Sequence, residues 1–312
     1  MRVSWLAFFC AGCLLAVEPY PRRWFLNAHN CYPDRGRGAD RFERARQAGL
    51  SAFELDLVWS EPLGRTVISH ERKLTGQEPA LDSHFARFLL PELRQLPPEQ
   101  PGLLLLLDFK TDHPGPPGEV RSLLLRYRDL VTANGARGDA PTSTPLRYRP
   151  LTVLLTGHAA AIARYEAAVA DGEPFLAMGN REPAERRFRE EIAEYFPQPA
   201  TVFYRVFNFQ WIHIEREPNS KAGAFTAAEE SRLRSLVETA RQEGYWLRAW
   251  NLNATSRAWS EEHNFGGPAA LLERWRAALE AGVDMVATDE YDLAGRFTRT
   301  AAARPRKARS TR

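Results

Sequence analysis

Strand and helix signals alternate eight times along this chain, and this alternation constrains the fold more than any other feature. The run Gly102–Asp108 (GLLLLLD) is apolar up to its last residue and stands between turn signals. That pattern is typical of a strand buried on both faces of a parallel sheet. Eight strand and helix pairs in about 270 residues are the content of a closed β/α barrel. We therefore predict an α/β protein with a single closed (β/α)8 barrel.

The individual elements follow from apolar periodicity and from the turn residues between them. The predicted strands are 24–28, 52–58, 102–108, 151–156, 174–178, 201–207, 246–250 and 284–288, with a short extra strand at 66–69. The predicted helices are 39–49, 81–96, 119–131, 158–170, 182–195, 227–244 and 268–282. The alternative is an open doubly wound sheet, and the absence of a Gly-rich phosphate loop after any early strand weakens it.

The two ends of the chain differ from the barrel region, which we predict to span residues 19–298. Residues 1–18 have a charged start at Arg2 and an apolar run at 5–17, the pattern of an export signal. We expect a periplasmic or secreted protein. Lipid attachment at Cys13, in the box Cys10-Ala11-Gly12-Cys13, is the minority alternative. Residues 299–312 are basic and aperiodic, so we predict a solvated disordered tail, with contact to anionic lipid as the less common role.

Composition excludes some classes of partner. The 312 residues are 44% hydrophobic, enough for a sizeable core, and the formal charge is only +3. Such a small net charge gives no global basic field for nucleic acid. We expect a monomer, with peripheral membrane contact as a further option.

The stretch 24–71 holds two histidines around a pair of carboxylates. His29 and His70 each follow a short apolar run, and Glu54 and Asp56 lie between them in FELDLVW. Residues i and i+2 of a strand face the same side, so the two carboxylates point together and repel unless a cation lies between them. The histidines could then act as acid and base around that cation. Taken singly, each residue is more often structural; the order of all four favours a site.

The next predicted strand adds an acid and a base in LLDFKTD. Asp108 could complete a three-carboxylate oxygen site, and Lys110 on the same strand face would add fixed positive charge. Oxygen ligands suit Mg²⁺ or Ca²⁺, so we predict one divalent cation of that kind. Zinc fits less well, because the site offers few nitrogen ligands and no thiolate pair. A metal beside a lysine is suited to a phosphoryl group in its transition state.

Cys31 and the remaining strand ends supply further candidates. Cys31 lies two residues after His29, so a Cys/His nucleophile is conceivable, although an inert buried thiol is the commoner role. In a barrel of this kind the chemistry sits at the carboxyl ends of the strands. The other polar or aromatic residues at those ends are Thr156, His158, Asn180, Asn208, Trp250, Asn251 and Asp289.

Five segments carry a resemblance to a known superfamily. The chain is similar to the phosphatidylinositol-specific phospholipases C and glycerophosphodiester phosphodiesterases, which are β/α barrels that cleave phosphodiesters with two histidines. The similar segments are NAHNCY, FELDLVWS, ISHERKLTG, LLDFK and the pair LRAWNLN and MVATDEYD. They span roughly residues 24–297. The Asp-x-Lys form and the late Trp resemble the sphingomyelinase-D-like branch and the little-characterised branch that includes the altered-inheritance-of-mitochondria proteins, and we take the latter as nearest.

The resemblance implies a role for each matching residue. It makes His29 and His70 the acid/base pair and Glu54, Asp56 and Asp108 the metal ligands. It makes Lys110 a phosphate contact and places Trp250 in the substrate pocket. Asn30 stands where glycerophosphodiesterases have an arginine, and we include it among the substrate-binding candidates.

The implied function is metal-dependent cleavage of a phosphodiester, by hydrolysis or through a cyclic phosphate. The expected substrate is a glycerophosphodiester or a phospholipid headgroup. One alternative is a catalytically weak barrel that binds a phosphorylated ligand or lipid headgroup, because the arginine after the first histidine is missing. A glycosidase is less compatible, since Glu54 and Asp56 lie nearer to each other than the roughly 5 Å that separates the two carboxyl groups of such enzymes.

Overall fold

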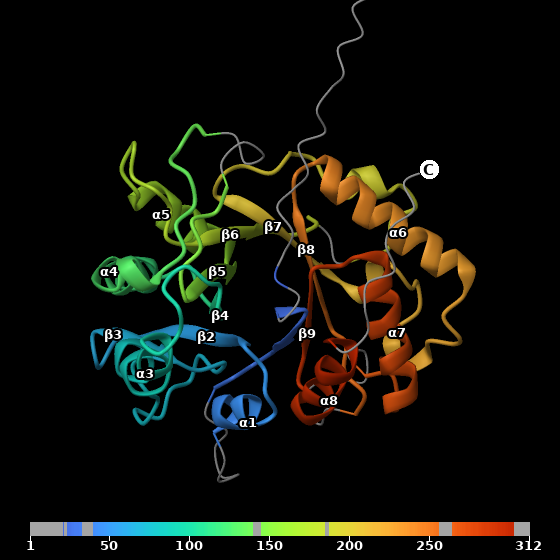
Figure 1. Cartoon of the computed structure of the whole chain (residues 1–312), viewed down its shortest axis with the longest axis horizontal. Coiled ribbons are helices and arrows are strands. Elements are labelled where there is room, and N and C mark those ends of the chain that lie inside the picture. The colour runs from blue at the N-terminus through green and yellow to red at the C-terminus, as the bar shows by residue number, and fades with distance from the viewer. Residues whose placement is uncertain are drawn as a thin grey trace, which may run out of the picture.

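The computed structural model describes residue 21 and residues 24–32, 40–139, 145–184, 187–255 and 264–302. Its centre is a closed barrel of eight parallel strands, seen as a ring in Figure 1. The closure is the parallel pairing of β1 with both β2 and β9. In chain order the barrel strands are β1 (Leu26–Ala28), β2 (Ala52–Ser60), β4 (Leu103–Phe109), β5 (Leu151–Gly157), β6 (Met178–Arg181), β7 (Tyr204–Gln210), β8 (Trp246–Trp250) and β9 (Met285–Thr288). The predicted fold is confirmed.

One strand lies outside the ring. β3 (Arg65–Ile68) pairs antiparallel with the second half of β2, with Leu57 opposite Ile68. This hairpin extends β2 beyond the barrel and returns the chain to the rim, where His70 follows. The extra strand predicted at 66–69 is therefore confirmed, and it positions the second histidine.

Helices cover the outside of the ring, as Figure 1 shows. The α-helices are α1 (Arg41–Gln47), α2 (Leu81–His84), α3 (Leu90–Leu93), α4 (Gly115–Arg126), α5 (Ala159–Ala168), α6 (Ala227–Gln242), α7 (Pro268–Ala281) and α8 (Tyr291–Ala302). A π-helical turn, Phe85–Leu89, joins α2 to α3, next to Pro91, which has no N–H to donate. Short 3-10 turns occur at Arg128–Leu130, Ile192–Tyr195, Trp211–His213 and Asn219–Lys221.

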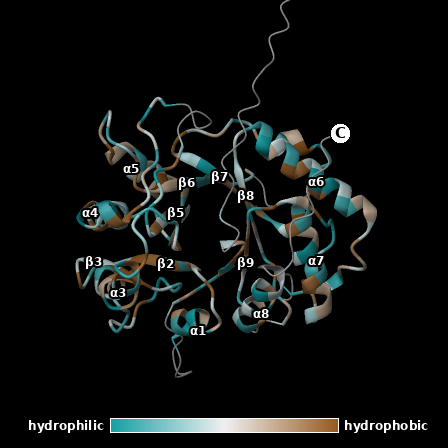
Figure 2. Ribbon diagram, in the orientation of Figure 1, coloured by the Kyte–Doolittle hydropathy of each residue, from teal (hydrophilic) through white to brown (hydrophobic). Residues whose placement is uncertain are grey.

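The barrel interior is apolar at one level and polar at the next. A separate cluster of buried residues fills the apolar level: Trp24, Ala52, Leu104, Leu106, Leu154, Met178, Val206, Trp246 and Met285. Beyond it, toward the carboxyl ends of the strands, come the buried polar residues Asn27, Glu54, Asp56, Asn180, Asn208 and Arg248. In Figure 2 β2 is largely brown (hydrophobic), and teal (hydrophilic) residues lie on the outer helices. The packed level supports the polar one as a rigid floor.

Several predicted boundaries were wrong. The strand predicted at 174–178 is β6, but it begins only at Met178, and Phe175 and Leu176 are buried ahead of it. Of the helix predicted at 182–195, the described residues form only the turn Ile192–Tyr195, because this charged stretch lacks an apolar stripe. The helix predicted at 119–131 is α4, which begins four residues earlier with Pro116 and Pro117 in its first turn.

The ends of the chain fall largely outside the described residues. The predicted export signal lies entirely there, as does most of the predicted tail. The tail boundary was set too early, because α8 runs to Ala302 and Arg299 Nη1 donates to the carbonyl of Ala48 at 3.1 Å. No helix in the described part of the chain combines the length and the apolar character needed to cross a membrane.

Candidate active site

A cavity of about 510 Å³ opens at the carboxyl ends of the barrel strands. Seven of the predicted site residues line it: His29, Asn30, Glu54, His70, Asp108, Lys110 and Trp250. The eighth, Asp56, is fully buried and forms an ion pair with Lys110. The structure therefore brings all the predicted site residues to one place, from segments up to 221 residues apart (His29 to Trp250).

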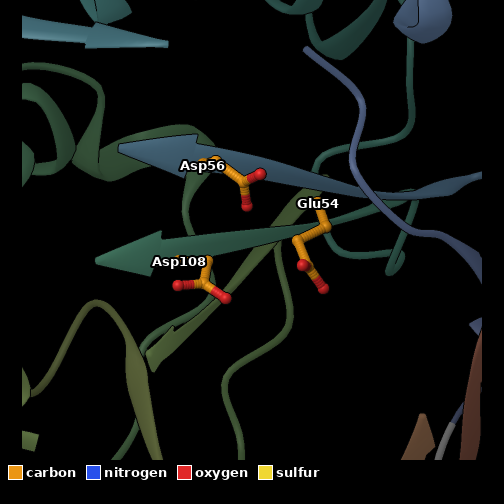
Figure 3. Close-up of side chains that lie close together, drawn as sticks. All are labelled: Glu54, Asp56 and Asp108. Carbon is orange, nitrogen blue, oxygen red and sulfur yellow. The ribbon is translucent and has the colours of Figure 1, made fainter. Parts of the chain in front are cut away.

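Three carboxylates form a compact cluster in this cavity. Glu54 and Asp56 share one face of β2, and Asp108 of β4 lies beside Asp56 in the parallel register. Each offers one oxygen, and these oxygens all lie within 4.8 Å of one another. Figure 3 shows the side chains of two neighbouring strands directed into the same space. Oxygen ligands at this spacing can hold a divalent cation.

The environment of Asp56 indicates that such a cation would fit. Oδ2 of Asp56 is buried and accepts no hydrogen bond, while Oδ1 lies 3.1 Å from Lys110 Nζ. Burial raises the pKa of Asp56, Lys110 opposes this, and the charges of Asp108 and Glu54 raise the pKa further. A buried carboxylate oxygen without a donor is costly, and a metal ion is one way to satisfy it.

Lys110 provides the fixed positive charge that the sequence predicts. Its Nζ lies 3.1 Å from Asp56 and 3.4 Å from Asp108. Burial lowers the pKa of Lys110, but Asp56 and Asp108 outweigh that effect and raise it above its ordinary value. The ammonium group is therefore charged at every physiological pH.

His29 is held between two carboxylates just after β1. Its Nε2 lies 3.4 Å from Oε1 of Glu54, and its Nδ1 lies 3.3 Å from Oδ2 of Asp289. Burial lowers the pKa of His29, while Glu54 and Asp289 together outweigh burial and raise it. The Tyr291 hydroxyl donates to the His29 carbonyl, so the backbone is anchored as well.

Asn30 braces this histidine. Its φ of 57° lies in the left-handed region, which asparagine tolerates better than most residues. Its amide nitrogen donates to Oδ1 of Asp289 at 3.1 Å and lies 2.6 Å from Nδ1 of His29. Asn30 thus fixes the partners of His29 and lines the cavity.

His70 approaches the cavity from the hairpin side and is less enclosed than His29. Its side chain is 30% exposed, and its ring lies 5.7 Å from the ring of Tyr32. Burial and the positive charge of Lys110 lower the pKa of His70. The two histidines thus line one cavity with pKa values displaced in opposite directions.

Cys31 does not contribute to the cavity. The thiol is fully buried, its Sγ donates to the carbonyl of Ala28 at 3.5 Å, and burial raises its pKa well above the ordinary value. A thiol in that state is not a nucleophile. The interpretation of Cys31 as an inert buried residue agrees with this environment.

Arg248 is the main site residue that the sequence analysis missed. It lies on β8, is 3% exposed, and pairs through Nη2 with Glu54. Its Nη1 donates to Oδ1 of Asn208 at 3.1 Å. The available signal was its place in WLRAW, where Arg248 shares one strand face with Trp246 and Trp250 and alternates with Leu247 and Ala249. Trp246 packs inside the barrel, so Arg248 faces the barrel axis as well.

Glu182 was missed too, because residues 182–195 were assigned to a helix. It follows β6 and accepts hydrogen bonds from Asn180 at 3.2 Å and from Asn208 at 2.7 Å. Glu182, Asn208, Gln210 and His158 all line the cavity on the side away from His70 and the hairpin. This wall is polar, and Glu182 contributes a carboxylate to it.

No protein-family model and no curated protein sequence matches this chain. Solved structures do. A Ca²⁺-dependent phosphatidylinositol-specific phospholipase C from Streptomyces antibioticus has a TM-score of 0.54 at 16% identity, covering 88% of this chain and 96% of that one. A glycerophosphodiester phosphodiesterase from Agrobacterium tumefaciens str. C58 has a TM-score of 0.49 at 12% identity, covering 89% and 99%.

These identities are low, so the comparison establishes a shared fold. The shared barrel agrees with the fold that the sequence resemblance implies. None of the comparisons supports the assignment to the altered-inheritance-of-mitochondria branch. The chain has a (β/α)8 barrel of the same architecture as the Streptomyces enzyme.

Proposed function

We propose that this protein is a metal-dependent phosphodiesterase that acts on a glycerophosphodiester or a phospholipid headgroup. The observation that carries the proposal is the composition of one cavity. Two histidines, a three-carboxylate cluster and a buried lysine meet at the carboxyl end of a barrel, where barrel enzymes place their chemistry. Each group has a part in phosphoryl transfer.

Glu54, Asp56 and Asp108 would hold one divalent cation, Mg²⁺ or Ca²⁺. When bound, such a cation polarises a phosphoryl oxygen and neutralises the negative charge of the group. Lys110 adds a second positive charge to the same face of the cluster. It lines the cavity, so its ammonium group can also contact the phosphoryl oxygens.

His29 and His70 move the protons. One accepts the proton of the attacking oxygen, and the other donates a proton to the leaving oxygen. Glu54 and Asp289 keep the His29 ring oriented through Nε2 and Nδ1. The attacking oxygen belongs to water in direct hydrolysis, or to a substrate hydroxyl beside the phosphorus if a cyclic phosphate forms. Trp250 provides an apolar face in the same cavity.

A second candidate function is supported by the ion pairs of the cluster. Arg248 pairs with Glu54, and Lys110 pairs with both Asp56 and Asp108. Carboxylates that are already paired have a smaller need for a metal. The second candidate is therefore a barrel that binds a phosphorylated ligand without turning it over.

Release of p-nitrophenol from bis(p-nitrophenyl) phosphate, in the presence of Mg²⁺ or Ca²⁺, reports direct hydrolysis and so distinguishes the phosphodiesterase from the binding barrel. Phosphorus NMR of glycerophosphocholine reports a cyclic product if a substrate hydroxyl attacks. We expect His29→Ala and His70→Ala each to lower turnover at least about 100-fold. His113→Ala is the control, because His113 stacks on Trp59 and does not line the cavity. Full activity in both histidine variants would refute the proposal, and no turnover of either substrate would favour the binding barrel.

A further inference from the structure

Arg248 is a buried cation at the floor of the cavity, and the mechanism above gives it no part. Residues of three other strands converge on its guanidinium group. Nη1 donates to Asn208 of β7 at 3.1 Å, and Nη2 donates to Asn27 of β1 at 3.4 Å and to Glu54 of β2. The guanidinium is therefore fixed in place, yet the residue lines the cavity.

The hydrogen bonds of Arg248 leave Nε without an acceptor. The guanidinium carries five N–H groups, and Nε of Arg248 is buried with no acceptor. A buried N–H of a charged group without an acceptor is costly unless a ligand supplies one. Arg248 lines the cavity, so a ligand held there could supply the acceptor, and an anion satisfies a guanidinium best.

Arg274 shows what a purely structural arginine looks like in this barrel. It is fully buried on α7, and it pairs with a buried glutamate, Glu215, through Nε at 2.9 Å and Nη2 at 2.8 Å. Its Nη1 donates to Glu273 and its Nη2 also donates to the Gly223 carbonyl, so every nitrogen has a partner. Arg274 lines no part of the cavity. Arg248 differs from Arg274 in both respects, because its Nε has no acceptor and the residue lines the cavity.

Arg248 shares its carboxylate partner, Glu54, with a second cavity residue. Lys110 lies between Asp56 and Asp108, and Glu54 is shared between Arg248 and His29. The residue after His29 is Asn30, so the first strand supplies no guanidinium to the site. Among the described residues that line the cavity, Arg248 is the only arginine.

We propose that Arg248 is a substrate-binding residue that donates from its guanidinium to a non-bridging phosphoryl oxygen while it orients Glu54. This rests on the proposed function, because it places the phosphoryl group over β8 as well as over the carboxylate cluster. The planar guanidinium then offers directed donors, whereas Lys110 acts as a point charge. Asn27 and Asn208 are positioning residues, because they act on the substrate through Arg248.

Calorimetric titration of the full chain with inorganic phosphate, in Mg²⁺, measures this contact without turnover. We expect Arg248→Met to weaken phosphate binding at least about 10-fold, and Arg248→Lys to weaken it less, since lysine keeps the charge but loses the directed donors. The matched control is Arg274→Lys, which makes the same change in the structural arginine and should leave phosphate affinity within about 2-fold of the wild type. Unchanged affinity in Arg248→Met would overturn the proposal.

A measurement on the wild-type chain covers the case in which the Arg248 variants do not fold. The Nε–H resonance of Arg248 in a ¹⁵N-labelled sample should move downfield as phosphate is added, because this N–H gains an acceptor. A resonance that stays in place while phosphate saturates the protein would contradict the contact. Arg248→Ala with added guanidinium ion tests the same point: recovery of phosphate affinity supports it, and recovery of fold without affinity contradicts it.

The two proposals can fail separately. If the wild type binds phosphate through Arg248 but cleaves no phosphodiester, the binding role stands and the phosphodiesterase proposal fails. If the wild type cleaves phosphodiesters while Arg248→Met keeps its phosphate affinity, the phosphodiesterase proposal stands and the binding role of Arg248 fails. A wild type that binds no phosphate at millimolar concentration would overturn the assignment of Arg248.

Discussion

Gly157, a single residue at the end of β5, determines how closely two strand ends can approach at the cluster. Its φ is 88°, and a Cβ there would collide with the carboxylate of Asp108 and with the backbone of Phe109. Gly172 has a similar φ of 80° and open space around it. A comparison of Gly157 with Gly172 therefore distinguishes the free-energy cost of a left-handed backbone from the cost of the collision with Asp108 and Phe109.

Gly157→Ala should therefore destabilise the protein more than Gly172→Ala. Both variants lose about 1 kcal/mol from the left-handed backbone, and Gly157→Ala should lose roughly 1–3 kcal/mol more from overpacking. Urea unfolding of the two variants and the wild type measures the difference. Equal losses in the two variants would show that Asp108 can move aside freely.

His84 predicts how stability changes with pH away from the cavity. It is buried among Phe42 and Phe88, and burial, with a contribution from Arg87, lowers its pKa from 6.5 to about 4. The unfolded chain therefore binds this proton more readily than the folded chain. The folded state should lose up to about 3 kcal/mol between roughly pH 6.5 and 4, and nothing from this group above pH 7.

The variant His84→Leu isolates this effect, because leucine fills a similar space and does not titrate. Its free energy of unfolding should fall less steeply than that of the wild type as the pH drops from 6.5 to 4. Chemical denaturation at several pH values gives the two curves. Parallel curves would mean that His84 is protonated without cost in the folded state.

At this scale the sequence predicted the residues whose partners lie on the same or the next strand. Glu54 and Asp56 share a face because side chains alternate along β2, and Asp108 and Lys110 do so along β4. Arg248 escaped prediction because its partner Glu54 lies 194 residues earlier. Only the closure of the barrel brings β8 near β2, and only the folded structure shows that Nε of Arg248 lacks an acceptor.

Among the elements, α7 secures the long connection between β7 and α6 through Arg274. The buried Glu215 in that connection accepts two hydrogen bonds from Arg274, and it accepts another from Trp211 Nε1 at 2.6 Å. A buried glutamate that loses its arginine keeps an uncompensated charge. The connection and the helix are therefore coupled by electrostatics as well as by apolar packing.

Arg274→Met should cost about 3–5 kcal/mol, because it leaves the carboxylate of Glu215 without its cation. The double variant Arg274→Met/Glu215→Met should lose less, since no buried charge remains. Thermal and urea unfolding of the two variants measure both quantities. A double variant less stable than the single one would contradict this account of the pair.

Element boundaries were predictable where apolar periodicity and end signals agree, as for α6 and β8. Boundaries were not predictable where a buried apolar run lacks regular structure. Phe175, Leu176 and Ala177 are as apolar as a strand, but they belong to the core ahead of a four-residue β6. Periodicity reports burial, and burial alone does not distinguish a strand from an irregular buried segment.

For the whole molecule, eight parallel strands explain why distant segments form one site. Their carboxyl ends meet at one rim, so polar residues at the ends of most of these strands line a single cavity. The apolar level below holds that rim rigid. Export, peripheral membrane contact and a monomeric state stay predictions from the sequence.

The most direct test of the central claim is the metal dependence of phosphodiester cleavage. The purified chain is treated with EDTA, and the cleavage rates of bis(p-nitrophenyl) phosphate and glycerophosphocholine are followed as Mg²⁺ or Ca²⁺ is added back, beside Asp56→Asn. The account predicts no activity in EDTA, recovery with one of the two ions, and a loss of at least about 100-fold in Asp56→Asn at saturating metal. Cleavage at the same rate in EDTA, or full activity in Asp56→Asn, would contradict it.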